Sequence, residues 1–79
     1  MKIRVDVMLK NGVLDPQGKA IGKALGNLGF GGVTDVRAGK VIELDLAETD
    51  REKALEAARK MAEKLLANLV IEDFKVSVV

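Results

Sequence analysis

The change from a strand pattern to a helix pattern falls within one short stretch: Asn11-Gly12-Val13-Leu14-Asp15-Pro16-Gln17-Gly18-Lys19-Ala20. Asparagine followed by glycine is typical of a turn, so the preceding strand is predicted to end there. Asp15 is a favourable N-cap, and Pro16 fits the first helical position, where its missing N–H is not needed. The stretch therefore predicts a turn that leads directly into the first helix.

The periodicity of the apolar residues changes across this turn. Residues 1–9 are apolar at every second position, with mostly charged residues between them, which is typical of a strand with one buried face. Residues 16–28 show a helical period instead. Gly29 suits the position after that helix, where a left-handed backbone costs glycine little. The apolar face of the first helix consists of Ala20, Ile21, Ala24, Leu25 and Leu28.

Two further strands and a second helix are predicted in the middle of the chain. Residues 33–38 and 41–47 are predicted as strands joined across Gly39, and so short a connection makes them an antiparallel hairpin. Thr49-Asp50-Arg51-Glu52 is a capping box that opens the second helix, and Asn68 closes it. The apolar stripe of this helix, which we expect in the core, consists of Ala54, Leu55, Ala58, Met61, Ala62, Leu65 and Leu66.

A last strand over residues 74–78 completes the order β-α-β-β-α-β. With right-handed crossovers, this order predicts a ferredoxin-like α+β fold, an antiparallel four-stranded sheet with both helices on one face. We expect residues 1–79 to form a single domain.

The composition bears on stability and location. The chain is 48% hydrophobic but only 3% aromatic, and it has no cysteine or histidine for a disulfide or a zinc site. Small domains without such links often gain stability by oligomerising, so we expect at least a homodimer. The net charge is +1. There is no apolar run of signal-peptide or membrane-spanning length, so we expect a cytoplasmic protein with no membrane partner.

The sheet face without helices is predicted to present both acidic and basic side chains. No aromatic residue is among them, which argues against nucleic-acid binding. Four of them, Asp6, Asp35, Glu43 and Asp45, offer oxygen ligands of the kind that magnesium or calcium takes. Basic residues lie between them, which favours cross-strand ion pairs over a metal site. The predicted face consists of Lys2, Arg4, Asp6, Asp35, Arg37, Val41, Glu43, Asp45, Lys75 and Ser77.

The sequence shows no catalytic or cofactor-binding site. With no histidine or cysteine and a single serine, Ser77, the usual nucleophile–base pairs cannot be assembled. Gly26, Gly29, Gly31 and Gly32 follow a helix and precede a strand, the reverse of a phosphate-binding loop, so they are interpreted as turn glycines. An independent enzyme is not predicted.

Several segments, in this order and spacing, resemble the family of PurS small subunits of phosphoribosylformylglycinamidine synthase, an enzyme of purine biosynthesis. The chain departs from the family at Leu69, where proline is frequent, and at Gly31-Gly32, where polar residues are common. The matching segments are Leu9-Lys10, Gly12-Val13-Leu14-Asp15-Pro16-Gln17-Gly18, Ala24-Leu25, Leu28-Gly29, Val36-Arg37, Gly39-Lys40, Ile42-Glu43-Leu44, Lys64-Leu65-Leu66-Ala67-Asn68 and Val70-Ile71-Glu72-Asp73-Phe74.

The resemblance implies a ferredoxin-like subunit that forms dimers or larger oligomers and has no active site of its own. It implies two partners: a large subunit that performs an ATP-dependent amidation, and a glutaminase subunit that releases ammonia from glutamine. The small subunit would join them and support ammonia transfer. ATP, magnesium and glutamine would be used by this carbon–nitrogen ligase complex and not bound by this chain.

A partner surface is expected at four polar residues of the matching segments, Asp15, Gln17, Arg37 and Lys40, because folding alone does not require their side chains. The structural alternatives are a helix cap for Asp15, a cross-strand ion pair for Arg37 and an ordinary hairpin lysine for Lys40. The alternative function is a ligand-sensing ferredoxin-like module that binds a small molecule at its dimer interface.

Overall fold

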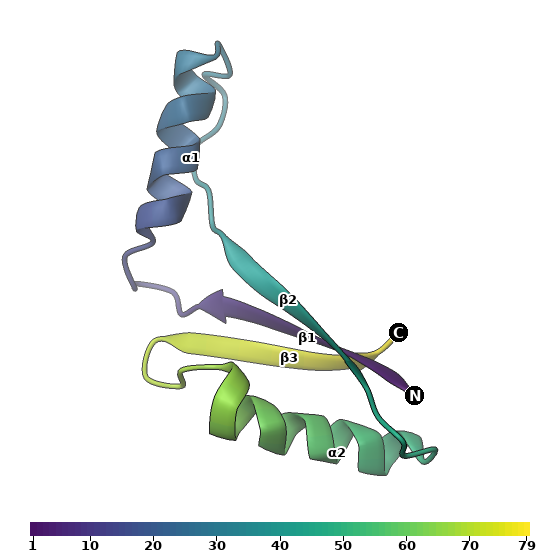
Figure 1. Ribbon diagram of the computed structural model, residues 1–79. Coiled ribbons are helices and arrows are strands. Elements are labelled where there is room, and N and C mark those ends of the chain that lie inside the picture. Colours follow the sequence, from purple (N-terminus) through teal and green to yellow (C-terminus); the bar gives the residue numbers. More distant parts are fainter.

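The computed structural model describes residues 1–79, and Figure 1 shows a sheet with one helix against it and a second helix that projects away. None of the helices is both long enough and apolar enough to cross a membrane. The elements are β1 (Lys2–Leu9), α1 (Pro16–Asn27), β2 (Gly39–Asp45), α2 (Arg51–Met61), the π-helical turn η1 (Ala62–Leu66) and β3 (Glu72–Val78).

The sheet has three strands in the order β2-β1-β3, and both neighbouring pairs are antiparallel. The register pairs Ile3 of β1 with Leu44 of β2 on one side and with Val78 of β3 on the other. An α+β chain with two α-helices is confirmed, but the single chain lacks the predicted four-stranded sheet.

The core lies between the sheet and α2. Alternate residues of β1 point at the helix, and Ile3, Val5 and Val7 are the largest fully buried side chains. Small residues on α2 let the helix approach the sheet closely, and together these residues form one cluster. The buried cluster consists of Ile3, Val5, Val7, Ala54, Leu55, Ala58, Ala62 and Ala67. The partly buried residues packed around it include the inward residues predicted for the other strands, Ile42, Leu44, Leu46, Phe74, Val76 and Val78.

The predicted hairpin across Gly39 is wrong. Residues 33–38 are not a strand, and the chain runs on from them into β2 without a turn. Gly39 itself pairs with Met8 inside the sheet. A Cβ at this position would collide with the Met8 side chain and the carbonyl oxygen of Val7, so the glycine permits a close approach of two strands.

The prediction that both helices cover one face of the sheet is also wrong, because α1 projects from the sheet (Figure 1). Its only buried residue is Gly18, and Ile21 and Leu28 are exposed. The molecule measures 48 × 25 × 14 Å, with a radius of gyration of 15.8 Å. A compact chain of this length has a radius of gyration of about 12 Å. We call α1 and the following residues 28–38 the arm, and we call the three strands with α2, η1 and residues 67–71 the sheet part.

The second helix starts and ends differently from the prediction. Its N-cap is Asp50, not Thr49, since the Asp50 carboxylate accepts a hydrogen bond from the backbone N–H of Lys53 at 3.1 Å. The helix continues through η1 and ends at Leu66, before Asn68. Asn68 instead shapes the turn into β3, where its carbonyl oxygen accepts hydrogen bonds from the N–H groups of residues 71 and 72.

Candidate functional site

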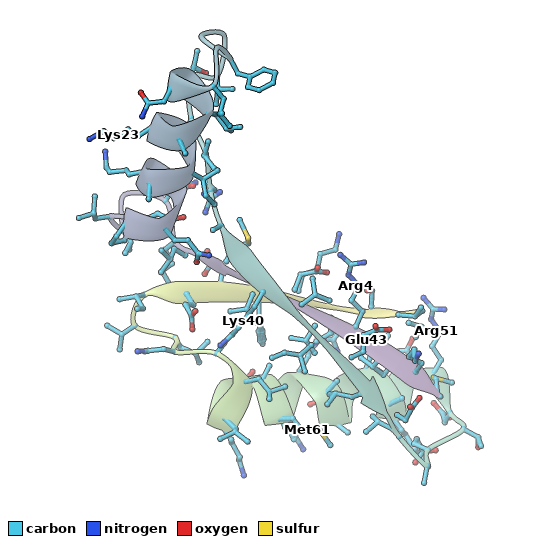
Figure 2. All side chains as sticks on the ribbon, turned by 45° about the horizontal axis from the view of Figure 1, so that its top comes forward. Arg4, Lys23, Lys40, Glu43, Arg51 and Met61 are labelled. Atoms are coloured by element: carbon cyan, nitrogen blue, oxygen red, sulfur yellow. The ribbon has the colours of Figure 1, made fainter.

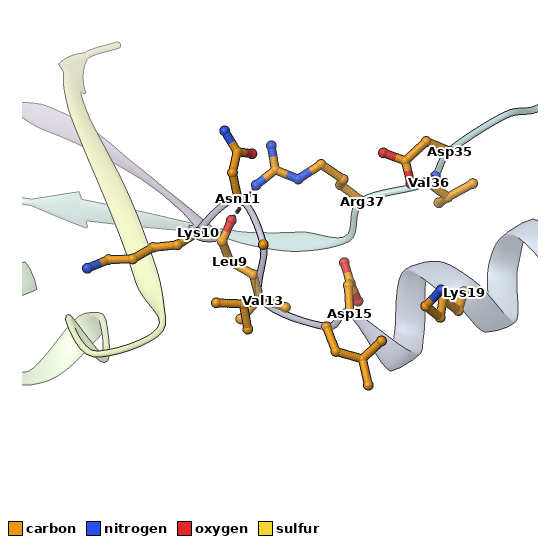
Figure 3. A pocket seen from close by; sticks show the side chains of 11 residues that line it. Leu9, Lys10, Asn11, Val13, Asp15, Lys19, Asp35, Val36 and Arg37 are labelled. Atoms are coloured by element: carbon orange, nitrogen blue, oxygen red, sulfur yellow. Dashed lines mark hydrogen bonds between the residues drawn. The ribbon is translucent and has the colours of Figure 1, made fainter.

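The arm joins the sheet part where the end of β1, the start of α1 and the start of β2 meet (Figure 3). All four residues predicted for a partner surface lie here. We call this region the arm base and define it as Leu9, Asp15, Gln17, Arg37, Ala38 and Lys40.

Asp15 ties two distant segments together. One carboxylate oxygen accepts a hydrogen bond from the N–H of Gly18 at 2.8 Å, which caps α1 as the sequence predicts. The other oxygen accepts one from the N–H of Ala38 at 2.9 Å, 23 residues further along the chain. The predicted cap is therefore confirmed, and the same side chain also fixes the end of the segment that returns from the arm to the sheet.

These contacts change the acidity of Asp15. The N–H groups of Gly18 and, to a lesser extent, Ala38 stabilise the carboxylate, and the Arg37 guanidinium adds a favourable charge. Together they hold the pKa of Asp15 below the 3.8 of an unperturbed aspartate. Asp15 is therefore ionised at neutral pH, as its double acceptor role requires.

Two further contacts fix the arm base. Arg37 donates a hydrogen bond from its guanidinium group to the carbonyl oxygen of Leu9, at the end of β1 (Figure 3). Gly18 lies so close to the Val36 carbonyl oxygen that a Cβ would collide with it. Glycine is required here because helix α1 touches the returning segment, residues 33–38, at this point.

The structure brings the predicted residues together around two shallow hollows. Asp15, Gln17 and Lys40 border a hollow of about 230 Å³, together with Glu72 of β3. Asp15 and Arg37 border a neighbouring hollow of about 200 Å³, which the 10–14 turn closes on its other side. The four predicted residues therefore lie close together, although Arg37 is not in a strand and Lys40 is not in a hairpin, and their contact with a partner stays a prediction.

The chemistry of the arm base suits binding. It contains no serine, cysteine or histidine, and two of its charged groups, Asp15 and Arg37, are held by backbone partners. Gln17 and Lys40 are exposed, and Lys40 makes no ion pair. The arm base thus offers an exposed amide and an exposed ammonium group, which can form hydrogen bonds with another molecule.

The open face of the sheet carries the expected ion pairs. Lys2 and Glu43 form a cross-strand pair with 3.6 Å between the charged atoms, and Arg4 contacts Asp6 along β1 at 2.9 Å. Figure 2 labels Arg4 and Glu43 on this region. Asp35 and Arg37 lie outside the sheet, contrary to the prediction for this face. No three acidic side chains approach one another closely enough to hold a metal ion.

Sequence reasoning missed one surface on the second helix. Met61 and Leu65 were predicted in the core, but they are 39% and 83% exposed. They lie with Ala57 in a row at a spacing of four, next to Lys60 and Lys64. That spacing was visible in the sequence. The π-helical turn that exposes Leu65 left no signal there.

Comparison with known proteins gives a match over nearly the whole chain. The profile of the family described as "PurS: Phosphoribosylformylglycinamidine (FGAM) synthase" matches residues 2–79. The phosphoribosylformylglycinamidine synthase subunit PurS of Bacillus subtilis is 47% identical over 77 residues, which cover 98% of this chain and 90% of the relative.

Solved structures agree with the sequence match. The crystal structure of Methanocaldococcus jannaschii PurS, described as one of the subunits of formylglycinamide ribonucleotide amidotransferase in the purine biosynthetic pathway, superposes with a TM-score of 0.85 at 42% identity. The match covers 99% of this chain and 96% of that one. A chain in the structure of PurLQS from Thermotoga maritima superposes with a TM-score of 0.89 at 35% identity, covering 99% and 95%.

Proposed function

The chain belongs to the PurS family, and we propose that it is the small subunit of phosphoribosylformylglycinamidine synthase in purine biosynthesis. The family match over residues 2–79 carries this proposal. The similarity to a chain of a solved PurLQS assembly supports it, because that relative was determined together with other subunits. These matches favour a subunit role over the ligand-sensing alternative.

Within this role, the chain joins the large amidating subunit and the glutaminase subunit, supports ammonia transfer and performs no reaction itself. We call those two proteins the companion subunits. Gln17 and Lys40 at the arm base are the groups that contact a companion subunit, with Asp15 and Arg37 holding them in place. Their exposure and their shared hollow support this assignment. The role also supports a cytoplasmic location.

ATP, magnesium and glutamine are handled by the companion subunits in this proposal. The residues of this chain do not form a fitting magnesium site, since its acidic side chains are dispersed and several already pair with lysine or arginine. No step of the reaction is therefore assigned to a residue of this chain.

The same proposal includes a homo-oligomer in which a second copy covers the arm. Leu28 and Phe30 are 73% and 58% exposed. The backbone groups of residues 31–35 have no backbone hydrogen-bond partner. An extended segment with free backbone groups and apolar side chains is suited to pairing with another chain. A second copy would supply the strand contacts and the helix cover that the single chain lacks.

Reconstitution tests the subunit role. The synthase is assembled from its two companion subunits with and without this chain, and product formation is measured with glutamine and, separately, with ammonia. We expect glutamine-driven synthesis to require the chain. Equal glutamine-driven rates with and without it would show that the proposal is wrong.

Substitutions in the arm test the homo-oligomer. Leu28→Asp is expected to weaken self-association by about 30-fold or more, because a charge replaces an apolar side chain in the interface. Sedimentation velocity at several concentrations measures the change. Val41→Asp, an equally apolar exposed position on the open sheet face, is the control and should leave self-association within about twofold of the unchanged chain. An unchanged oligomer in Leu28→Asp would rule out the arm as the contact.

A further inference from the structure

The chain from Val33 to Asp45 runs without a turn from the arm into the sheet part, where the sequence predicts a hairpin across Gly39 (Figure 1). It lies beside α1 over residues 33–36 and forms β2 over residues 39–45. β1 pairs with only one edge of β2, because the strand order is β2-β1-β3. The outer edge of β2 and the backbone of residues 31–35 therefore both lack backbone hydrogen-bond partners in this chain, and each is suited to pairing with an extended segment.

One face of this segment lies under a helix at both of its ends. Every second side chain of an extended segment lies on the same side. Val36 faces α1, because a Cβ at Gly22 of α1 would lie 3.5 Å from its side chain. Ile42 and Leu44 lie on the same side by this alternation, and they pack against the core that α2 covers. The even-numbered residues therefore form one face, with α1 over its first half and α2 over its second half.

The connection between the two halves is too short for a hairpin within one chain. The favoured two-residue turns have a positive φ at their first residue, which would be Ala38, and alanine rarely adopts such a φ. The N–H of Ala38 is also bound by the Asp15 carboxylate at 2.9 Å. A longer turn would withdraw Gly39 from its pair with Met8 of β1.

The side-chain pattern opposes the same hairpin. A turn at residues 38–39 would place Val36 opposite Val41, on the open sheet face. It would place Asp35 opposite Ile42, on the face that packs against the core. A second copy related by a two-fold axis perpendicular to the sheet avoids this conflict, because the axis preserves both faces and makes the two segments antiparallel. Even-numbered residues of one copy then lie opposite even-numbered residues of the other.

We propose that two copies of this chain exchange their arms. Residues 33–38 of one copy pair with the outer edge of β2 of the other copy, and its α1 lies on the helix-covered face of that sheet. Ile21 and Leu28, which are exposed in the single chain, are then covered. The short connection at Ala38 and Gly39 enforces the exchange, since short connections promote domain swapping. This inference rests on the homo-oligomer of the proposed function and specifies how its copies pair.

A longer connection tests the exchange. The tetrapeptide Gly-Asn-Gly-Ser is inserted between Ala38 and Gly39, so that residues 33–38 can fold back onto β2 of their own chain. We expect the oligomer mass measured by sedimentation velocity to fall by half, while the amides of α1 keep the slow hydrogen exchange that they have in the unchanged oligomer. The same insertion between Gly31 and Gly32, in an exposed loop, is the matched control and should leave the mass unchanged. An unchanged mass in the first variant, or a lower mass with fast exchange throughout α1, would overturn the proposal.

Crosslinking tests the exchange without lengthening the connection, and it decides the matter if the longer chain does not fold. The chain has no cysteine, so Asp35→Cys carries a photoactivatable crosslinker at one site. Equal amounts of ¹⁵N-labelled and unlabelled chains are mixed under refolding conditions and crosslinked. We expect adducts between residue 35 and β2, many of them joining a labelled chain to an unlabelled one. Val70→Cys, on the turn before β3, is the control and should form no adduct with β2.

The outcomes separate this inference from the proposed function. An oligomer in which residue 35 reaches β2 only within one chain, or does not reach it, would overturn the exchange and leave the homo-oligomer standing. If the unchanged chain is a monomer at all concentrations, the homo-oligomer fails, and the exchange fails with it. The subunit role is decided separately, by reconstitution of the synthase.

Discussion

Different interactions stabilise the sheet part and the arm. Eight of the nine buried residues lie in the sheet part, and the ninth is Gly18 in the arm. The sheet part therefore has a hydrophobic core of its own. The arm relies on hydrogen bonds at its base, made by Asp15 and Arg37 to backbone groups, and on the close approach of Gly18 to Val36.

This difference shows that one short chain contains a part that folds on its own contacts and a part shaped for contacts with another chain. Burial of apolar surface is the main stabilising term in folding, and the arm has little of it. Regions with few buried apolar contacts open first. We expect the arm to be ordered fully only when a second copy covers it.

The largest expected difference between the two parts is in the cost of truncating a buried side chain. Two isoleucines, one in the sheet part and one in the arm, measure it. Ile3 is fully buried in the sheet part, so Ile3→Ala should lower the free energy of unfolding by about 2–5 kcal/mol. Ile21 in the arm is 39% exposed, so Ile21→Ala should cost less than about 1 kcal/mol in dilute, monomeric protein. Urea denaturation followed by circular dichroism measures both. Equal costs at low concentration would show that the arm has a core of its own.

The next-largest expected change in stability comes from replacing two glycines of α1 by alanine. Alanine is favoured over glycine in a helix by about 0.5–1 kcal/mol, so Gly26→Ala, with open space around it, should stabilise the chain by that amount. At Gly18 the added Cβ would collide with the Val36 carbonyl oxygen, so Gly18→Ala should destabilise by about 1–3 kcal/mol. The midpoints of thermal unfolding of the two variants show whether each change stabilises or destabilises the chain. A stabilising Gly18→Ala would mean that α1 and the segment around Val36 are not in contact.

The smallest expected change in stability comes from removing the two hydrogen bonds that the Asp15 carboxylate accepts from Gly18 and Ala38. Asp15→Ala removes the N-cap of α1, so it should lower the stability less than Gly18→Ala does and should speed hydrogen exchange in the first turn of α1. Because the folded-state pKa of Asp15 is lowered, its contribution is complete above the unperturbed value of 3.8 and is lost as the pH falls through the folded-state value.

The stability difference between the unchanged chain and Asp15→Ala should therefore be constant from about pH 5 to neutral pH and shrink below about pH 4. Urea titrations at pH 7 and pH 3 measure it. A difference that grows on acidification would contradict the assigned sign of the pKa change.

From the sequence alone, the helix cap at the candidate site could be predicted, whereas the role of the four residues as a partner surface stays a prediction. Asp15 was identified as a helix cap from the Asp-Pro pair, and the structure confirms that contact with Gly18. Its second contact, with Ala38, was beyond sequence reasoning because it joins segments 23 residues apart. Gly39 was misassigned for a related reason: glycine serves turns and close approaches equally well, and only the neighbouring strand distinguishes them.

What the sequence determined by itself is local: the alternating strands β1 and β3, the start of α1 at Asp15-Pro16, and the residues that favour burial. The family was also identifiable, because short segments in a fixed order are a property of the sequence. The tertiary structure alone decided that residues 33–38 leave the sheet, that α1 projects from it and that η1 exposes Leu65. The physical reason is that periodicity specifies which side chains favour burial but not which chain covers them.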